Sequence, residues 1–214
     1  MRIDHLVWYS PDLAEGQRHF ASMDNPPAYG GEHPGDGTCN SLLSLGEATY
    51  IEILARDPKQ PAAALDRELA GLQSQGLYHW AVGGVDLPGI AGKAKAAGYK
   101  ASHVVSGGRR LPNGKMLSWK LVGLHDHPFG ALLPFFIDWT DSEHPALGAP
   151  RGGRLAGIEL YSPQAEKLNL LFSSLGLALS ARHRDEPGIG INLESRQGPL
   201  RLESFQPLPC GFVI

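Results

Sequence analysis

A short apolar stretch followed by a turn recurs three times along the chain, at residues 3–13, 77–88 and 155–163. Each stretch has the length and apolar content of a strand and ends in polar, Gly or Pro residues that favour a turn or a helix start. In the first two copies a histidine, His5 or His79, lies seven residues before an Asp-Leu pair. The third copy repeats the Tyr-Ser-Pro of the first but has glycine in the histidine position. The matched spacing indicates that His5 and His79 are equivalent residues of a repeated unit.

A helical pattern follows each of these stretches. Ser10 and Pro11 favour the start of the first helix, as N-cap and first-turn residues. The third helix should end at Gly176, after apolar residues that recur at helical spacing: Leu168, Leu171, Phe172 and Leu175. Strands are expected after each helix, at residues 41–45, 49–54, 102–106, 116–122, 132–138, 177–181, 189–193 and 199–205, with a hairpin turn at 112–114.

The units therefore begin near residues 1, 77 and 155, a period of roughly 75 residues that is too long for a solenoid. We predict an α+β fold in which repeated βαβββ modules form a cupped, mixed β-sheet, an open barrel. The third, partial unit could complete the sheet, cover its edge or mimic a partner subunit. The predicted parts are module one at 1–58, a helical linker at 59–76, module two at 77–140 (together 1–140), and the third unit at 151–214.

Composition narrows the classes of protein that remain. The chain is 42% hydrophobic and 19% charged, as in soluble globular proteins, and its net charge of -3 lacks the basic excess of nucleic-acid-binding proteins. Cys39 and Cys210 are too far apart in sequence for a zinc-type Cys-x-x-Cys motif. With neither a signal-peptide pattern nor an apolar stretch long enough for a membrane span, we expect a cytoplasmic protein without nucleic-acid or membrane partners. Monomer and homodimer both remain open.

Several motifs resemble the glyoxalase, bleomycin-resistance and dioxygenase superfamily, also called vicinal oxygen chelate proteins. They are DHLVW at residues 4–8, YIEIL at 50–54 and YHWAV at 78–82, while GEHPGDGTCN at 31–40 is similar to the glyoxalase-like subgroup. The resemblance covers about residues 1 to 140. It implies two βαβββ modules that form a cup and hold a divalent metal through their first and last strands. On this basis His5, Glu52 and His79 are the expected metal ligands. The fourth position falls near Phe136, which cannot ligate, with Asp138 two residues further on.

Two histidines and one carboxylate suit iron, manganese, nickel or zinc. Such a metal could polarise a carbonyl or chelate a diol of a small oxygen-rich molecule. Without the fourth carboxylate, a metal-dependent lyase or ring-cleaving dioxygenase fits better than an isomerase of the glyoxalase I type. No catalytic residue beyond the metal ligands follows from the sequence. The alternative is a metal-free protein of the same fold that binds or sequesters a small molecule in the cup.

Other residues are candidates for contact with the ligand. His33, Thr38 and Asn40 lie in or beside a turn-rich segment, where binding residues often occur. Arg110 precedes a hairpin turn and could bind a substrate carboxylate, although either of the two arginines there could also be solvated. Trp119 could form an aromatic wall of the cup. Trp8 and Trp80 stand at odd offsets from their histidines, so they should point into the core between helices and sheet.

Overall fold

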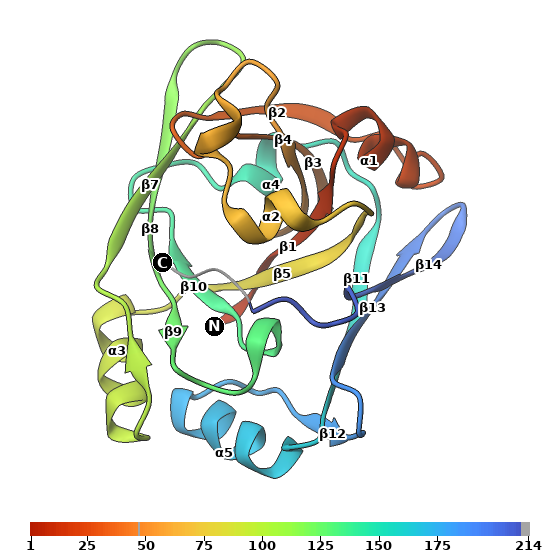
Figure 1. The fold of residues 1–214 in the computed structure, drawn as a ribbon. Coiled ribbons are helices and arrows are strands. Elements are labelled where there is room, and N and C mark those ends of the chain that lie inside the picture. Colours follow the sequence, from red (N-terminus) through yellow and green to blue (C-terminus); the bar gives the residue numbers. More distant parts are fainter. Residues whose placement is uncertain (47, 211–214) are drawn as a thin grey trace.

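The computed structural model describes residues 1–46 and 48–210 and contains a closed β-barrel with the strand order β1-β4-β3-β2-β7-β8-β10-β5 (Figure 1). The predicted α+β class and curved sheet of repeated modules are confirmed, and the sheet is closed rather than open. The first module consists of β1 (Arg2–Ser10), α1 (Leu13–His19), β2 (Ala28–His33), β3 (Thr38–Gly46) and β4 (Thr49–Arg56). The second consists of β5 (Gly76–Gly83), α3 (Leu87–Ala96), β7 (Val105–Arg110), β8 (Met116–Val122) and β10 (Phe135–Asp138).

The two modules repeat the same strand pairing. In the first, β1 runs parallel to β4, and in the second, β5 runs parallel to β10. The modules meet where β1 pairs antiparallel with β5, and again where β2 meets β7. Because side chains alternate between the two faces of a strand, one set of residues from every strand points into the barrel.

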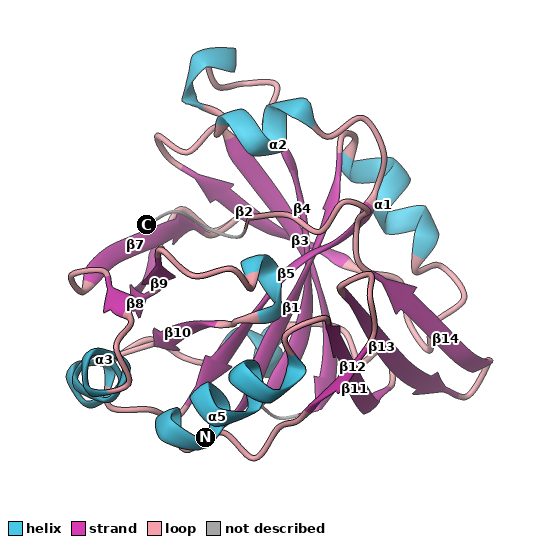
Figure 2. Cartoon of the chain, turned by 60° about the horizontal axis from the view of Figure 1, so that its bottom comes forward, coloured by secondary structure: helices cyan, strands magenta, loops and turns pink. Residues whose placement is uncertain are grey.

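Short elements connect the modules and close the barrel ends. The linker between the modules holds a 3-10 turn at Ala62–Ala64 and the single-turn helix α2 (Arg67–Gly71), which lies over one end of the barrel in Figure 2. A small second sheet is formed by β6 (Lys100–Ala101) and β9 (Leu124–His125). The remaining short elements are a 3-10 turn at Gly130–Leu132 and the helix α4 (Pro145–Gly148).

The third unit forms a sheet of its own. It comprises β11 (Arg154–Ser162), α5 (Ala165–Leu175), β12 (Ala181–His183), β13 (Gly188–Ser195) and β14 (Gly198–Glu203). Its strand order, β12-β11-β13-β14, differs from that of the modules because β11 lies between β12 and β13. The unit repeats the order of elements along the chain but not the way in which the modules pair their strands.

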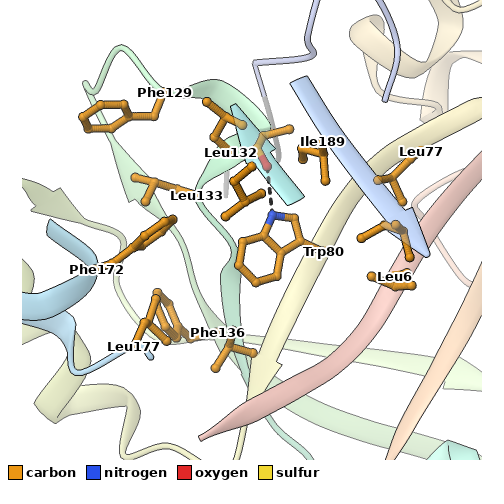
Figure 3. Close-up of a cluster of buried hydrophobic side chains, with 14 of the residues drawn as sticks. Leu6, Leu77, Trp80, Phe129, Leu132, Leu133, Phe136, Phe172, Leu177 and Ile189 are labelled. Carbon is orange, nitrogen blue, oxygen red and sulfur yellow. Dashed lines mark hydrogen bonds between the residues drawn. The ribbon is translucent and has the colours of Figure 1, made fainter. Parts of the chain in front are cut away.

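The third sheet packs its apolar face on the outside of the barrel. Trp80 is fully buried there, and its indole N–H donates a 3.0 Å hydrogen bond to the carbonyl oxygen of Ala131. Figure 3 shows this cluster, in which Leu6 and Trp80 of the barrel lie near Ile189 of the third sheet. Trp8 is also buried, against α1, as its offset from His5 predicts.

The helix ends follow local sequence signals, with one difference. The Asp12 side chain, not Ser10, caps α1 by accepting a 2.8 Å hydrogen bond from the backbone N–H of Glu15, and Pro11 lies before the helix. At α5, Gly176 has a φ of +82°, the left-handed conformation that glycine adopts easily, and it ends the helix as predicted. Among the described residues, no helix combines the length and apolar character that crossing a membrane requires.

Candidate functional site

The barrel encloses a cavity of about 700 Å³. One part of its wall is apolar and aromatic, with Leu54, Leu121, Phe135 and Ile137. Another part is polar, and its residues come from both modules: His5, His33, Thr38, Asn40, Tyr50, Glu52, Arg109, Trp119 and Trp139. An apolar cavity with a few convergent polar groups is the usual form of a small-molecule site.

Glu52 lies at the centre of the polar wall. Its Oε1 accepts a 2.7 Å hydrogen bond from the Asn40 side-chain amide. The Nε2 atom of His5 lies 3.7 Å from Oε2, and the Nε2 atom of His33 lies 3.6 Å from Oε1. Burial alone would raise the pKa of this carboxyl, but His33, His5, the Asn40 hydrogen bond and the Arg109 charge together hold it below its ordinary value. Glu52 is therefore an ionised carboxylate between two imidazoles.

His5 is held from behind by Asp4, whose Oδ1 lies 2.8 Å from His5 Nδ1. The strand β1 has a bulge between Ile3 and His5, so Asp4 has no partner on β5 and its side chain is free to turn toward His5. Gly83 leaves space for the Asp4 side chain, because a Cβ at residue 83 would lie 2.3 Å from Asp4 Oδ2. Since a carboxylate only accepts hydrogen bonds, the His5 Nδ1–H donates to Asp4, and Nε2 faces Glu52.

Asp4 has two further partners. Trp139 donates its indole N–H to the carboxylate at 3.1 Å. His144 accepts the backbone N–H of Ala146 on Nδ1, so its Nε2 carries the proton that it donates to Asp4 Oδ2 at 3.1 Å. Burial raises the pKa of Asp4, yet the hydrogen bonds from His144 and His5 outweigh burial and hold it well below the ordinary range. Asp4 is an anion that fixes the orientation of His5.

His33 lies on the opposite side of Glu52. Its Nδ1 is 2.9 Å from the Thr38 hydroxyl, and its ring packs edge-on against Trp119 with 6.0 Å between centroids. Burial lowers the pKa of His33, although the charge of Glu52 raises it, so the ring is neutral at neutral pH. The predicted ligand contacts His33, Thr38, Asn40 and Trp119 thus all line the cavity.

Arg109, and not Arg110, is the arginine that lines the cavity. Arg110 is exposed at the end of β7, so the choice of Arg110 from the sequence is corrected by one residue. Arg109 is only 4% exposed, and its Nη1 donates a 3.1 Å hydrogen bond to Asn40 Oδ1. The Asn40 amide therefore accepts from Arg109 and donates to Glu52, which fixes its orientation.

The structure brings His5 and Glu52 together but places His79 in different surroundings. His79 is buried at a second, small pocket, and its Nδ1 donates to the carbonyl oxygen of Trp80 at 3.1 Å. The ring of Phe135 packs against both histidines, at centroid distances of 5.3 Å from His5 and 5.4 Å from His79. Phe135 thus contacts both imidazoles with an apolar ring that cannot ligate a metal.

The register of β10 explains this arrangement. On β1, Val7 is opposite Glu52, and at the equivalent place on β5, Ala81 is opposite Phe135. The fourth ligand position is therefore Phe135, one residue before the predicted Phe136, which lies in the core outside the barrel, while Asp138 is exposed. Among the described residues, no three His, Cys, Asp or Glu side chains gather closely enough to hold a metal ion. The predicted set His5, Glu52 and His79 does not fit a shared metal in this arrangement.

Several residues of the site were not chosen from the sequence, among them Asp4, Tyr50, Arg109, Trp139 and His144. Asp4 and Arg109 are each adjacent to a residue that was chosen, His5 and Arg110, and only the bulge and the strand register distinguish them. Trp139 and His144 lie beyond or at the end of the second module, and no sequence pattern links them to Asp4.

Comparisons with known proteins agree with this fold. A family model described as a glyoxalase-like domain matches residues 3–176. A hypothetical protein from Staphylococcus aureus has a similar structure, with a TM-score of 0.65 and 15% identity over 94% of this chain and 84% of that one. Two others have lower TM-scores: methylmalonyl-CoA epimerase from Mycobacterium tuberculosis (0.45, 16% identity, 63% of this chain and 85% of that one) and a Mn(II)-bound glyoxalase from Novosphingobium aromaticivorans (0.46, 10%, 94% and 81%). No curated protein matches the sequence. At these identities the structural similarity concerns the fold alone.

Proposed function

Because the chain belongs to the family of proteins with a glyoxalase-like domain, we propose that its barrel cavity binds a small molecule and transfers a proton on it. The observation that carries this proposal is the position of Glu52, an ionised carboxylate that lines the cavity between the Nε2 atoms of His5 and His33. A buried carboxylate flanked by imidazoles is suited to general acid–base catalysis. The supported substrate is a small carbonyl compound with a hydrogen on the neighbouring carbon.

In this proposal Glu52 removes the proton from the carbon next to the carbonyl. His5 can take that proton from Glu52 on Nε2, because Asp4 stabilises the imidazolium that results. The 3.7 Å between His5 and Glu52 is longer than a hydrogen bond, so this transfer requires the two groups to approach when substrate binds. Return of the proton to the same or an adjacent carbon gives an epimerisation or an isomerisation.

A metal-dependent lyase or dioxygenase would need a third ligand beside His5 and Glu52. His5 does have the carboxylate partner that metal-bound histidines often have, in Asp4. The third predicted ligand, His79, does not line the cavity with His5 and Glu52, and among the described residues no three such side chains gather closely enough to hold a metal ion. We therefore assign no step of the reaction to a metal.

The second candidate is a binding protein that holds a small molecule without changing it. The apolar and aromatic part of the cavity wall favours this function, since such a wall binds a ligand without chemistry. The two proposals share the ligand site and differ only in the role of Glu52.

Solvent exchange separates the two candidates. The protein is incubated in D₂O with pyruvate, phenylpyruvate or hydroxyacetone, and loss of the proton signal next to the carbonyl is followed by NMR. If the protein transfers a proton, exchange should be faster than the uncatalysed rate, and Glu52→Gln should lose this acceleration. Glu32→Gln is the matched control and should retain it, because Glu32 lies on β2 and pairs with the exposed Lys59. Binding without accelerated exchange supports the second candidate instead.

A further inference from the structure

Arg109 is a buried cation that makes no direct ion pair within the described part of the chain. Its side chain is 4% exposed, and no Asp or Glu among the described residues lies within 4.0 Å of its guanidinium. The guanidinium makes one hydrogen bond within the described part of the chain, to Asn40, and its buried Nε has no partner there. A buried guanidinium that makes no direct ion pair and leaves an N–H unbonded is costly, because burial removes its hydration.

The neighbouring strand β2 is shaped to accommodate this group. A Cβ at Gly30 would lie 2.7 Å from Arg109 Nη1 and 2.5 Å from Asn40 Oδ1. A Cβ at Gly31 would lie 3.0 Å from Arg109 Cγ. A side chain at Gly30 would displace Arg109 or Asn40, so Gly30 leaves the space in which the guanidinium lies, whereas Gly31 chiefly allows the close approach of the Arg110 carbonyl oxygen, 2.0 Å from where a Cβ would be.

Arg109 is also joined to the base of the proposed reaction. The Asn40 amide lies between them, accepting from Arg109 at 3.1 Å and donating to Glu52 at 2.7 Å. A ligand group bound by Arg109 would therefore be only a few covalent bonds away from the ligand atom that Glu52 can reach. Gly107 lies on β7, as Arg109 does, and it allows the indole of Trp119 to approach this strand, since a Cβ at residue 107 would be 2.4 Å from the indole nitrogen. Trp119 forms a flat wall of the cavity beside His33.

We infer that the natural ligand of the cavity carries a carboxylate, that Arg109 binds it, and that the substrate is therefore a small carboxylic acid with a carbonyl near the acid group. This inference rests on the proposed function for the position of the carbonyl, and on Arg109 alone for the carboxylate. The planar guanidinium matches a carboxylate in a two-bond geometry that an ammonium group does not offer.

A different role for Arg109 would be to orient Asn40 without touching the ligand. In that role, loss of Arg109 would weaken every ligand of the cavity to the same extent, whether it is charged or not. Direct binding predicts a loss that is specific for the charged form of a ligand, so a pair of ligands that differ only in charge distinguishes the two roles.

The experiment measures binding of phenylpyruvate and of its methyl ester through the fluorescence of Trp119 and Trp139, which both line the cavity. Arg109→Gln is compared with Arg110→Gln, the same change at the exposed neighbouring residue, and circular dichroism checks that both variants fold. We expect wild type to prefer the acid, and Arg109→Gln to lose roughly 30-fold or more in affinity for the acid while its affinity for the ester changes little. Arg110→Gln should match wild type.

The inference is overturned if wild type binds the ester as tightly as the acid, if neither compound binds at millimolar concentration, or if Arg109→Gln weakens both compounds equally. Glu52→Gln separates this inference from the proposed function. If that variant exchanges protons as fast as wild type, the proposed function fails, whereas selective binding of the acid still supports the role of Arg109.

Discussion

Glu52 and Phe135 occupy equivalent positions in the two modules. Glu52 pairs with Val7, two residues after His5, and Phe135 pairs with Ala81, two residues after His79. The first module therefore contributes a carboxylate to the cavity, and the second contributes an aromatic ring that packs against both His5 and His79. The two modules thus differ in polarity at these equivalent positions. His5 lines the cavity and His79 does not.

The first prediction concerns metal binding. We expect wild-type protein purified with added manganese, nickel or zinc to hold far less than one metal per chain, because among the described residues no three His, Cys, Asp or Glu side chains gather closely enough to hold the ion. Phe135→Glu places a carboxylate at the position of the second module that is equivalent to Glu52 of the first. This change should raise the metal content measured by elemental analysis.

Phe135→Gln is the control for this change, since it has a similar size and polarity but cannot supply an anionic ligand. Near-stoichiometric metal in wild type that is lost in both His5→Ala and His79→Ala would contradict the account and restore the predicted three-residue site.

The second prediction concerns acid sensitivity. Burial lowers the pKa of His79 to about 4, although its hydrogen bond to the Trp80 carbonyl raises it. An unfolded histidine takes up a proton near pH 6.5, so the stability that depends on neutral His79 is present above that pH and is lost as the pH falls toward 4. The free energy of unfolding should fall by about 3 kcal/mol over this range from this residue alone.

His79→Leu should therefore flatten the pH dependence of unfolding in urea between pH 6.5 and 4. His183→Leu, at an exposed histidine, is the control and should leave the slope unchanged. Equal slopes in wild type and His79→Leu would show that His79 is not a buried neutral residue.

The third prediction concerns Asn40. Asn40→Asp places a negative charge beside Glu52 and removes the amide donor, which should raise the pKa of Glu52. The pH below which the exchange rate falls should therefore move higher. The profile of exchange rate against pH measures this shift. Asn113→Asp, on the exposed turn between β7 and β8, should leave the profile in place, and an unmoved profile in Asn40→Asp would remove Asn40 from the site.

The fourth prediction concerns the third sheet. Ile191 on β13 is fully buried in the core that the third sheet shares with the barrel, and Ile191→Ala should lower the free energy of unfolding by about 2 to 5 kcal/mol. Leu170 on α5 is 70% exposed, and Leu170→Ala should change the free energy of unfolding by less than about 0.5 kcal/mol. Urea titration measures both values, and a second, separate transition in wild type would mean that the third unit unfolds independently.

Much of the fold follows from the sequence because its signals are local and repeated. The spacing of His5 and His79 from their Asp-Leu pairs identifies the duplicated modules, and Gly176 marks the end of α5. The strand order of the third sheet could not be predicted, because the order of elements along the chain is the same as in the modules while the pairing is different.

The site was predictable only in part, for a related reason. Alternation along a strand identifies which residues share a face, but a shift of one residue exchanges the faces. Such a shift separates Arg109 from Arg110 and Phe135 from Phe136, and a bulge in β1 adds Asp4 to the site. Contacts such as those of Trp139 and His144 with Asp4 depend on tertiary packing over about 140 residues of sequence.

The central claim is that Glu52 is a buried, ionised carboxylate that can act as a base, and its titration tests this claim most directly. The side-chain carboxyl carbon of glutamate is labelled with ¹³C, its signal is assigned by its absence in Glu52→Gln, and its chemical shift is followed by NMR as the pH is lowered. The account predicts that Glu52 stays ionised through pH 4.5, the ordinary pKa of glutamate, and is protonated only below it. A Glu52 signal that titrates above pH 6 would contradict the account, because burial would then outweigh the effects of His33, His5, Asn40 and Arg109 that hold the carboxylate ionised.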